Sequence, residues 1–264
     1  MAALVRQQSD VSGLASRVTL IRGDVRDTAS YEHALDGVDV VVHAAAVVGS
    51  GDRELNFSTH VGGSEALVAA MKRRGVKRCV FVSTIAAGYP RRSDYAESKR
   101  QAERIHLLSG VPTTVLRYNL FIGPDSPQVR KIAGMLRGRV VPVIGSGRRL
   151  IQPIHVDDAI AVLLQAIDDA GTAQKTFTVS GRDAVTFDRL LDLVSEAAWG
   201  RTRAKVHLPV PLCRMLAFVA GKALKNPPIT QGQITLIDQD AVSSVDDVKR
   251  SFAFEPRPLG AALG

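Results

Sequence analysis

Tyr95 and Lys99 form the clearest chemical pattern in the sequence. Their spacing of four residues places both side chains on one face of a helix, about one turn apart. An ammonium group beside a phenol favours the phenolate and lowers the pKa of the tyrosine, so that Tyr95 can donate and accept a proton. Ser83 and Thr84 end an apolar stretch just before this pair, where either hydroxyl could hydrogen-bond a substrate carbonyl or alcohol. Taken alone, the pair is typical of a solvated helix face; the strand end before it favours a catalytic site.

The elements that must position these residues follow from hydrophobic patterning. Short β-branched stretches alternate with amphipathic ones over the first two-thirds of the 264 residues, which is typical of a parallel α/β sheet. A helix is predicted at 56–74, closed by basic residues and then Gly75, which tolerates a left-handed cap. Strands are predicted at 3–6, 18–22, 38–43, 78–83, 113–117 and 176–180.

A further helix is predicted at 157–167, with Asp157 as its N-cap rather than as a catalytic acid. Its apolar side chains at helical spacing are Ile160, Leu163, Leu164 and Ile167.

From about residue 181 the hydrophobic pattern changes: it predicts mainly helices and few strands. Thr186 caps a predicted helix that Gly200 ends, and further helical stretches follow Asn226-Pro227-Pro228. We therefore expect a nucleotide-binding domain over 1–180 and a small, mostly helical substrate-binding lobe over 181–264. The cleft between them is the default site.

Composition excludes several classes of protein. Lys and Arg number 34 against 26 Asp and Glu, and because the excess is spread along the chain, a solvated basic surface is favoured over nucleic-acid binding. Cys79 and Cys213 are far apart and the histidines show no paired spacing, so no metal site is expected. No run of eighteen uncharged apolar residues is present to span a membrane, and Arg6 interrupts the start where a signal peptide needs an apolar stretch. We expect a cytoplasmic protein that binds a small molecule and is compatible with a homodimer.

One apolar segment leaves two interpretations open. Over residues 208–225, a single helix face carries Leu212, Met215, Leu216 and Val219. This face would contact a membrane surface or, as the favoured alternative, pack within the lobe.

At this point the chain resembles the short-chain dehydrogenase/reductase superfamily, in the extended and atypical branches described as NAD-dependent epimerase/dehydratase. Gly23-Asp24-Val25-Arg26-Asp27 resembles the GDxxD segment of the superfamily, and Val41-Val42-His43-Ala44-Ala45-Ala46 its HxAA strand end. The resemblance implies that Asp24 and Val25 lie near the adenine of NAD or NADP and that Ala44 and Ala45 lie under the cofactor. It also implies a catalytic set of Thr84, Ser83, Tyr95 and Lys99, with Lys99 touching the ribose as well.

Later segments extend the resemblance over nearly the whole chain. Leu116-Arg117-Tyr118-Asn119 with Gly123-Pro124 is similar to LRxxxxxGP, residues 152–158 to QPxHVDD, and residues 254–259 to FxPRPL. The resemblance implies a Rossmann-like doubly wound parallel sheet and an NAD(P)-dependent oxidoreductase or epimerase acting on an alcohol or ketone, with a nucleotide-sugar as one candidate. The branch that includes complex I accessory-subunit-like proteins is the most similar.

Two departures from the superfamily pattern weigh against a simple transfer of function. His60 stands where an Asn usually steadies the active-site helix; it is either a packed or solvated residue or a catalytic replacement. The first strand, glycine-rich turn and helix, which cradle the pyrophosphate, are not found ahead of residues 1–6, which match the second strand. A late start codon, a truncated gene, or real loss of the unit would each explain this.

The second departure has structural and functional consequences. A sheet without its central strand either leaves two strand edges unpaired or brings the flanking strands together. A non-catalytic scaffold or regulator that has lost cofactor binding is therefore the alternative function. Arg6, at the end of the presumed second strand, would suit the 2′-phosphate of NADP, and a solvated arginine explains it equally well.

Overall fold

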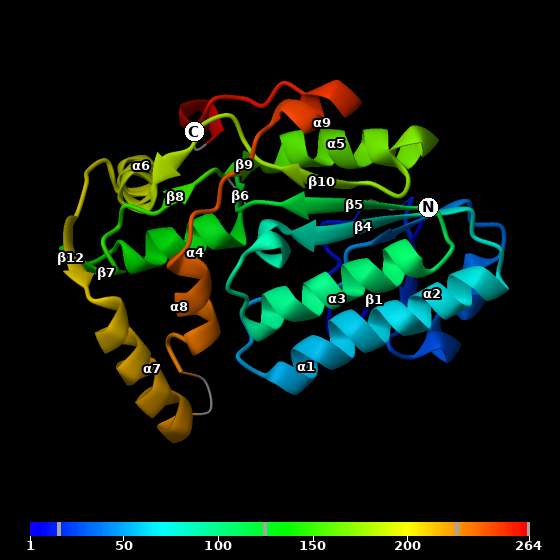
Figure 1. The fold of residues 1–264 in the computed structure, drawn as a ribbon, viewed down its shortest axis with the longest axis horizontal. Helices are drawn as coiled ribbons and strands as arrows, with labels where there is room; N and C mark the ends of the chain where they lie inside the picture. Colours follow the sequence, from blue (N-terminus) through cyan, green and yellow to red (C-terminus); the bar gives the residue numbers. More distant parts are fainter. Residues whose placement is uncertain (15–16, 124–125, 225–226, 263–264) are drawn as a thin grey trace.

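The central sheet is parallel, as predicted. A computed structural model describes residues 1–14, 17–123, 126–224 and 227–262, so Pro124 and Asn226 of the motifs above lie outside the described residues. Its largest sheet has four strands in the order β10-β5-β4-β3, all parallel (Figure 1). Their bounds are Val40–His43 for β3, Arg78–Thr84 for β4, Thr113–Tyr118 for β5 and Thr176–Val179 for β10.

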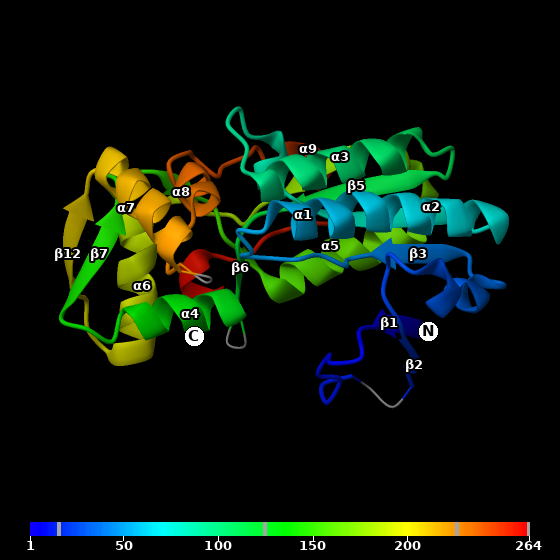
Figure 2. The ribbon, with the colours of Figure 1, turned by 90° about the horizontal axis from the view of Figure 1, so that it is seen from below.

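The first two strands stand apart from this sheet. β1 (Ala2–Val5) and β2 (Thr19–Arg22) form a separate parallel pair, which Figure 2 shows below the plane of β3. Leu4 and Ile21 attach the pair to the apolar cluster around Met71. Among the described strands, β1 pairs only with β2 and β3 only with β4. Of the two expected outcomes, the structure therefore has the unpaired edges.

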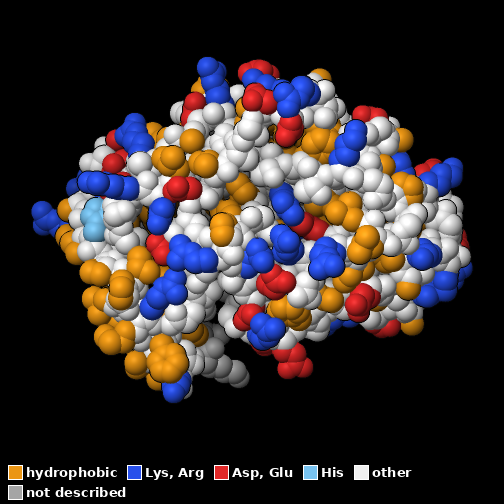
Figure 3. All heavy atoms as spheres, in the orientation of Figure 1, with side chains coloured by type: hydrophobic (Ala, Val, Ile, Leu, Met, Phe, Trp, Pro, Cys, Tyr) orange, Lys and Arg blue, Asp and Glu red, His pale blue; other side chains and the backbone are white. Residues whose placement is uncertain are grey.

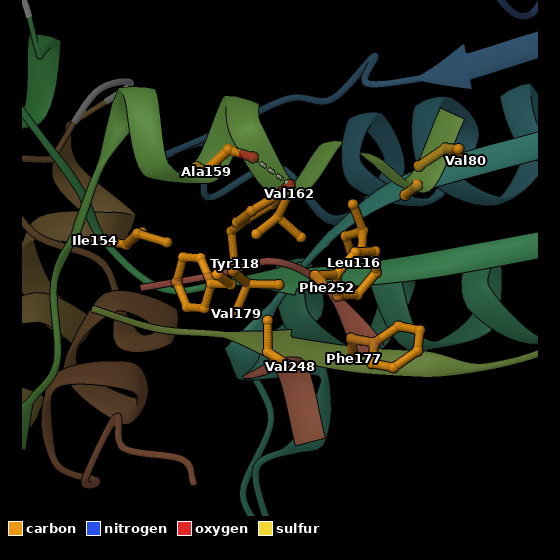
Figure 4. Close-up of a cluster of buried hydrophobic side chains, with 12 residues drawn as sticks. Val80, Leu116, Tyr118, Ile154, Ala159, Val162, Phe177, Val179, Val248 and Phe252 are labelled. Atoms are coloured by element: carbon orange, nitrogen blue, oxygen red, sulfur yellow. Dashed lines mark hydrogen bonds between the residues drawn. The ribbon is translucent and has the colours of Figure 1, made fainter. Parts of the chain in front are cut away.

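Side chains alternate across the sheet and divide the core into two layers. Phe81 and Val115 pack toward α3 (Asp94–Leu108) on one face. Val80 and Leu116 pack toward α5 (Val156–Asp168) and α9 (Asp246–Ser251) on the other, as Figure 4 shows. The Tyr118 hydroxyl in this second layer donates a hydrogen bond of 2.9 Å to the carbonyl oxygen of Ala159.

The helix predicted at 56–74 is a continuous helical stretch made of three segments. It comprises α1 (Arg53–Phe57), a single π turn at Ser58–Gly62 and α2 (Gly63–Arg73). Gly75 follows with φ of +67°, which confirms the left-handed cap. Short 3-10 turns at Thr28–Ser30, Glu32–Leu35, Ile85–Gly88, Ala170–Thr172 and Leu259–Ala262 complete the connections.

The prediction for the start of α5 is wrong. His155 is its N-cap, and the Nδ1 atom of that ring accepts a hydrogen bond from the backbone N–H of Asp157. Of the predicted apolar residues, Ile160 and Leu164 are 46% and 55% exposed, whereas Leu163 and Ile167 pack against the core of the sheet. The smaller Ala159, Val162 and Ala166 are buried there as well.

The second lobe contains strands that the sequence analysis missed. β7 (Val140–Ile144) pairs in parallel with β12 (Ala204–Leu208), and the short β8 (Leu150–Ile151) pairs with β11 (Val185–Thr186). α4 (Pro127–Met135) packs on α6 (Phe187–Trp199), which Thr186 caps and Gly200 ends, as predicted. β6 (Phe121–Ile122) and β9 (Ile154–His155) form one more parallel pair.

The two lobes are interleaved in sequence. β7 and α4 belong to the second lobe although they precede residue 181, whereas α9 and Phe254 return to the core of the central sheet. A single cut between 180 and 181 therefore does not separate the lobes.

The C-terminal motif is bonded to the first turn of α5. Asp158 accepts hydrogen bonds from the backbone N–H and Nε of Arg257 at 3.0 and 2.9 Å. Gln152 bonds the carbonyl oxygen of Gly181, where a Cβ would lie 1.9 Å from the Pro153 carbonyl oxygen. The segments around residues 152–158 and 254–259 therefore hold elements of the fold together and do not form part of the candidate site.

The apolar face of residues 208–225 is not packed within the lobe. In α7 (Val210–Ala223) the small residues Cys213 and Ala217 are buried against Ile234 of α8 (Gln231–Ile237). The large side chains on the other face of the helix are exposed: Leu212, Met215, Leu216 and Val219. Figure 3 shows hydrophobic side chains gathered at the lower left, over α7. The favoured packing interpretation is wrong for these four residues. In the part of the chain that is described, no helix is long and apolar enough to cross a membrane.

Candidate active site

Thr84 and Tyr95 meet at the carboxyl end of β4. Thr84 ends the strand and caps the following turn, with its Oγ1 accepting from the N–H of Ala86 at 3.3 Å. Tyr95 lies in the first turn of α3, whose N-terminus is capped by the Ser93 side chain. The Thr84 side chain lies close enough to the Tyr95 phenol to lower its pKa as a hydrogen-bonding neighbour.

Lys99 does not act on Tyr95 as the sequence analysis expected. Burial raises the pKa of Tyr95, and the hydrogen bond from Thr84 opposes that rise only in part. The Lys99 ammonium is directed to β4, where Nζ donates to the Val82 carbonyl oxygen at 2.7 Å and lies 4.2 Å from the centre of the Phe81 ring. Burial lowers the pKa of Lys99 to about 8. The predicted lowering of the tyrosine pKa is therefore wrong for this arrangement.

Ser83 belongs to a buried ionic network. Its hydroxyl donates a 2.6 Å hydrogen bond to Glu103, and Arg117 holds both oxygens of that carboxylate at 2.9 and 2.6 Å. Because the hydroxyl hydrogen is engaged inside the protein, Ser83 is not placed to donate to a substrate. Sequence analysis missed Glu103, although Tyr95, Lys99 and Glu103 repeat at a spacing of four and so share one helix face.

His60 is packed directly against the candidate catalytic tyrosine. Its ring meets that of Tyr95 edge to face at 5.6 Å between centres, and only 1% of the residue is exposed. Nε2 accepts from the N–H of Val47 at 3.0 Å, which leaves Nδ1 to donate to Ser98 at 2.8 Å; the Ser98 hydroxyl in turn donates to the Tyr95 carbonyl oxygen. Burial, with a contribution from Lys99, lowers the pKa of His60 to about 4. His60 thus links the segment after β3 to the start of α3.

Two further buried histidines, His43 and His106, pack around Phe81 of β4 near Lys99. His43 and His106 stack on Phe81 at 5.2 and 4.6 Å between ring centres. Burial is the largest cause that lowers the pKa of each. Across the described residues, no three His, Cys, Asp or Glu side chains are grouped to hold a metal ion.

A large cavity opens in front of Tyr95. Its volume is about 1300 Å³, and it lies between the loop after β3, the first turns of α3 and α4, the second half of α7, and α8. Of the four candidate catalytic residues, only Tyr95 lines it.

The expected cofactor residues follow the carboxyl ends of β1, β2 and β3. Arg6 is exposed, and Arg26 donates to both oxygens of Asp24, which holds the pKa of that carboxyl at about 2. The Val25 side chain is buried, and a Cβ on Gly63 would meet it at 2.7 Å. Ala44 and Ala45 are exposed.

These positions fit the adenosine part of a dinucleotide. The ionised Asp24 can accept from an amine or ribose hydroxyl, and exposed alanine methyls leave room for a planar ring. Gly49 and Gly51 lie in the loop between β3 and α1. The Asp52 carboxylate caps α1 there by accepting from the N–H of Leu55, and it would repel a diphosphate, so this loop is no phosphate site.

Comparisons with solved structures agree with this fold. UDP-glucose 4-epimerase from Thermotoga maritima, solved with UDP-glucose, superimposes with a TM-score of 0.76 at 21% identity, covering 98% of this chain and 87% of that one. The Thermus thermophilus UDP-glucose 4-epimerase complex with NAD gives 0.75 at 20% identity, covering 98% and 88%.

Two curated proteins are similar in sequence. The mitochondrial NADH-ubiquinone oxidoreductase 40 kDa subunit of Neurospora crassa is 25% identical over 245 residues, or 92% of this chain. The 2-alkyl-3-oxoalkanoate reductase of Shewanella oneidensis is 26% identical, covering 79% of this chain. The chain spans only 60% and 61% of the lengths of these relatives.

The family itself is shown by a match over more than half of the chain. The model of a family described as NAD(P)H-binding matches residues 1–138 of the 264. These residues include the candidate catalytic and cofactor positions. The chain therefore belongs to the NAD(P)H-binding family.

Proposed function

We propose that the chain is an NAD(P)-dependent oxidoreductase or epimerase that acts on an alcohol or ketone. The observation that carries the proposal is Tyr95, which lines a cavity of about 1300 Å³ and has the Thr84 side chain as its neighbour. The name of the Shewanella relative, a 2-alkyl-3-oxoalkanoate reductase, supports action on a ketone. The names of the epimerase structures support a nucleotide-sugar as the other candidate.

In this proposal Tyr95 is the acid and base. Burial keeps its phenol protonated at neutral pH, the state needed to give a proton to a carbonyl oxygen. The nicotinamide supplies the hydride. The carbonyl carbon gains that hydride and the oxygen gains the Tyr95 proton, so the ketone is reduced to an alcohol while the dinucleotide is oxidised; solvent then restores the proton.

Thr84 and Lys99 support this proton transfer. Thr84 orients the phenol and can hold the substrate oxygen, whereas Ser83 is committed to Glu103. Lys99 keeps two donors beyond its bond to Val82, and in the proposal these reach the ribose. Asp24, Ala44 and Ala45 would hold the adenosine part and the ring that follows it.

The choice between NAD and NADP rests on Arg6. This arginine is exposed and is one cause of the lowered pKa of Asp24, so it lies near the proposed adenosine site. If it holds a 2′-phosphate, Arg6→Ser weakens binding of NADPH by roughly tenfold and leaves that of NADH unchanged, as measured by calorimetry. Equal loss for both would assign Arg6 no role in selection.

The central test is Tyr95→Phe. Loss of the phenol hydroxyl is expected to lower turnover of 2-octanone, or of UDP-glucose, by at least about 100-fold while NAD(P)H still binds. Tyr118→Phe is the matched control, because its hydroxyl donates only to the Ala159 carbonyl within the core. Turnover by Tyr95→Phe at the level of the control would refute the assignment.

A second candidate is a non-catalytic scaffold or regulator. The unpaired edges of β1 and β3 favour it, because an exposed strand edge is a ready site for pairing with another chain. This alternative predicts no saturable binding of NADH or NADPH. Saturable binding of either dinucleotide would remove it.

A further inference from the structure

The walls of the cavity are apolar on two opposing sides. Phe218 and Leu224, from the second half of α7 and the residue after it, are 56% and 51% exposed. Val48 and Leu55, from the loop after β3 and from α1, are 69% and 36% exposed. When a ligand covers large apolar side chains that are otherwise exposed to water at a concave site, the free energy falls, which favours binding.

The cavity carries charges of both signs. Lys131 and Lys222 are the cations among the described lining residues, and Asp52 and Asp94 are the carboxylates; Asp94 is ion-paired with Arg53. No arginine is among the lining residues that are described. A diphosphate carries at least two negative charges and is recognised by clusters of arginine and lysine; the described lining offers it two lysines, no arginine and the Asp52 carboxylate.

Four helix N-termini reach the cavity, and an uncapped helix N-terminus could bind a phosphate. Each one has a cap from the chain itself. The side chains of Asp52, Ser93, Ser126 and Thr230 accept hydrogen bonds from the first turns of α1, α3, α4 and α8 respectively, and Gln233 completes a capping box in α8. Two of these N-termini also carry carboxylates at the cavity, Asp52 and Asp94.

From these observations we propose that the cavity takes an uncharged ketone or secondary alcohol with a hydrocarbon chain rather than a nucleoside diphosphate sugar. The proposal rests on the function above, since it specifies the substrate of the same site. The reacting oxygen lies at Tyr95 and Thr84. The hydrocarbon chain extends between Phe218 and Leu224 on one side and Val48 and Leu55 on the other.

A homologous series of methyl ketones tests the proposal. Turnover of 2-butanone, 2-hexanone, 2-octanone and 2-decanone with NADH and NADPH is measured as kcat/KM. Each methylene that enters the apolar cavity should raise kcat/KM by up to about fourfold, the factor that corresponds to about 0.8 kcal/mol. A flat series, or UDP-glucose bound more tightly than 2-decanone, overturns the proposal while leaving an oxidoreductase or epimerase in place.

Substitutions in α7 test where the hydrocarbon chain of the substrate lies. Phe218→Ser should reduce the gain per methylene by half or more. Leu216→Ser is the matched control, because Leu216 is 52% exposed on the same helix but does not line the cavity. Equal slopes in the two variants contradict a chain seated on Phe218.

A binding measurement separates this proposal from the proposed function. If neither the ketones nor UDP-glucose is turned over, the catalytic function fails, and 2-decanol is titrated into the chain without cofactor by calorimetry. Saturable binding that Phe218→Ser weakens and Leu216→Ser preserves supports an apolar ligand site. Absence of binding overturns it.

Discussion

Burial decides the protonation of the residues around Tyr95. Burial raises the pKa of Tyr95 and lowers those of Lys99 and His60 to about 8 and about 4. At neutral pH the phenol and the imidazole are therefore uncharged, and Lys99 carries the positive charge of the group. The proposed site is ready to donate a proton rather than to accept one, which suits ketone reduction.

The neutral state of His60 makes the fold sensitive to mild acid. Its pKa of about 4 lies below the ordinary value of 6.5, so between these values the unfolded chain binds more protons than the folded one. The stability contributed by the neutral ring is complete above about pH 6.5 and is lost as the pH falls toward 4. His43 and His106, whose pKa values are also lowered by burial, act in the same direction.

We expect the free energy of unfolding in urea to fall between pH 7 and pH 5, with His60 accounting for on the order of 2 kcal/mol. His60→Gln keeps a side chain that can bond Val47 and Ser98 but cannot be protonated, so its unfolding free energy should fall less over the same interval. An identical pH dependence in the variant and the wild type would show that His60 is not the group responsible.

At the scale of elements, one close backbone approach holds the end of β10 against the segment that leads into α5. Gly181, which follows β10, lies so close to the Pro153 carbonyl oxygen that there is no space for a Cβ. The same segment, residues 152–158, supplies Gln152, which bonds Gly181, and Asp158, which holds Arg257. This short segment thus joins the central sheet, α5 and the C-terminal segment.

Gly181→Ala should lower the free energy of unfolding by about 2 kcal/mol or more, because the new methyl must displace backbone. Gly134→Ala is the matched control: it lies in α4 with no atom near its would-be Cβ, and there alanine should raise stability by about 0.5–1 kcal/mol. Both values come from urea unfolding. Equal effects of the two substitutions would mean that the contact with Pro153 yields at little cost.

At the scale of the whole molecule, the separation of β1 and β2 from the four-stranded sheet governs local stability. The pair has one ladder of hydrogen bonds and is attached to the core by few buried side chains, whereas β4 is paired on both sides. Segments with little burial open more readily than the core. The edge of the molecule that carries Arg6 and Asp24 is thus expected to be its least stable part.

Amide hydrogen exchange tests this expectation. Amides of β1 and β2 should exchange on the order of 100-fold faster than those of β4 and β5 under native conditions. β3, which is paired on one side, should lie between them. If NADH or NADPH binds across this region, it should slow exchange in β1 and β2 more than in β5. Uniform protection across all these strands would contradict two separately stable sheets.

The sequence by itself determined the features that depend on near neighbours. Strand alternation, the caps at Thr186 and Gly75, and the position of Tyr95 at the start of a helix after a strand end are local, because each needs only residues a few positions away. The four long strands of the central sheet could therefore be predicted to within two residues at each end.

Only the tertiary structure decided the features that join distant parts of the chain. β7 pairs with β12, Ser83 bonds Glu103, and His60 bonds both Val47 and Ser98. No local sequence pattern encodes these interactions. The direction of the Lys99 ammonium depends on the carbonyl and ring that β4 presents to it, and the exposure of the outer face of α7 depends on what packs behind it. Periodicity shows which residues share a face; the partner of that face depends on how the remaining elements fill the space around it.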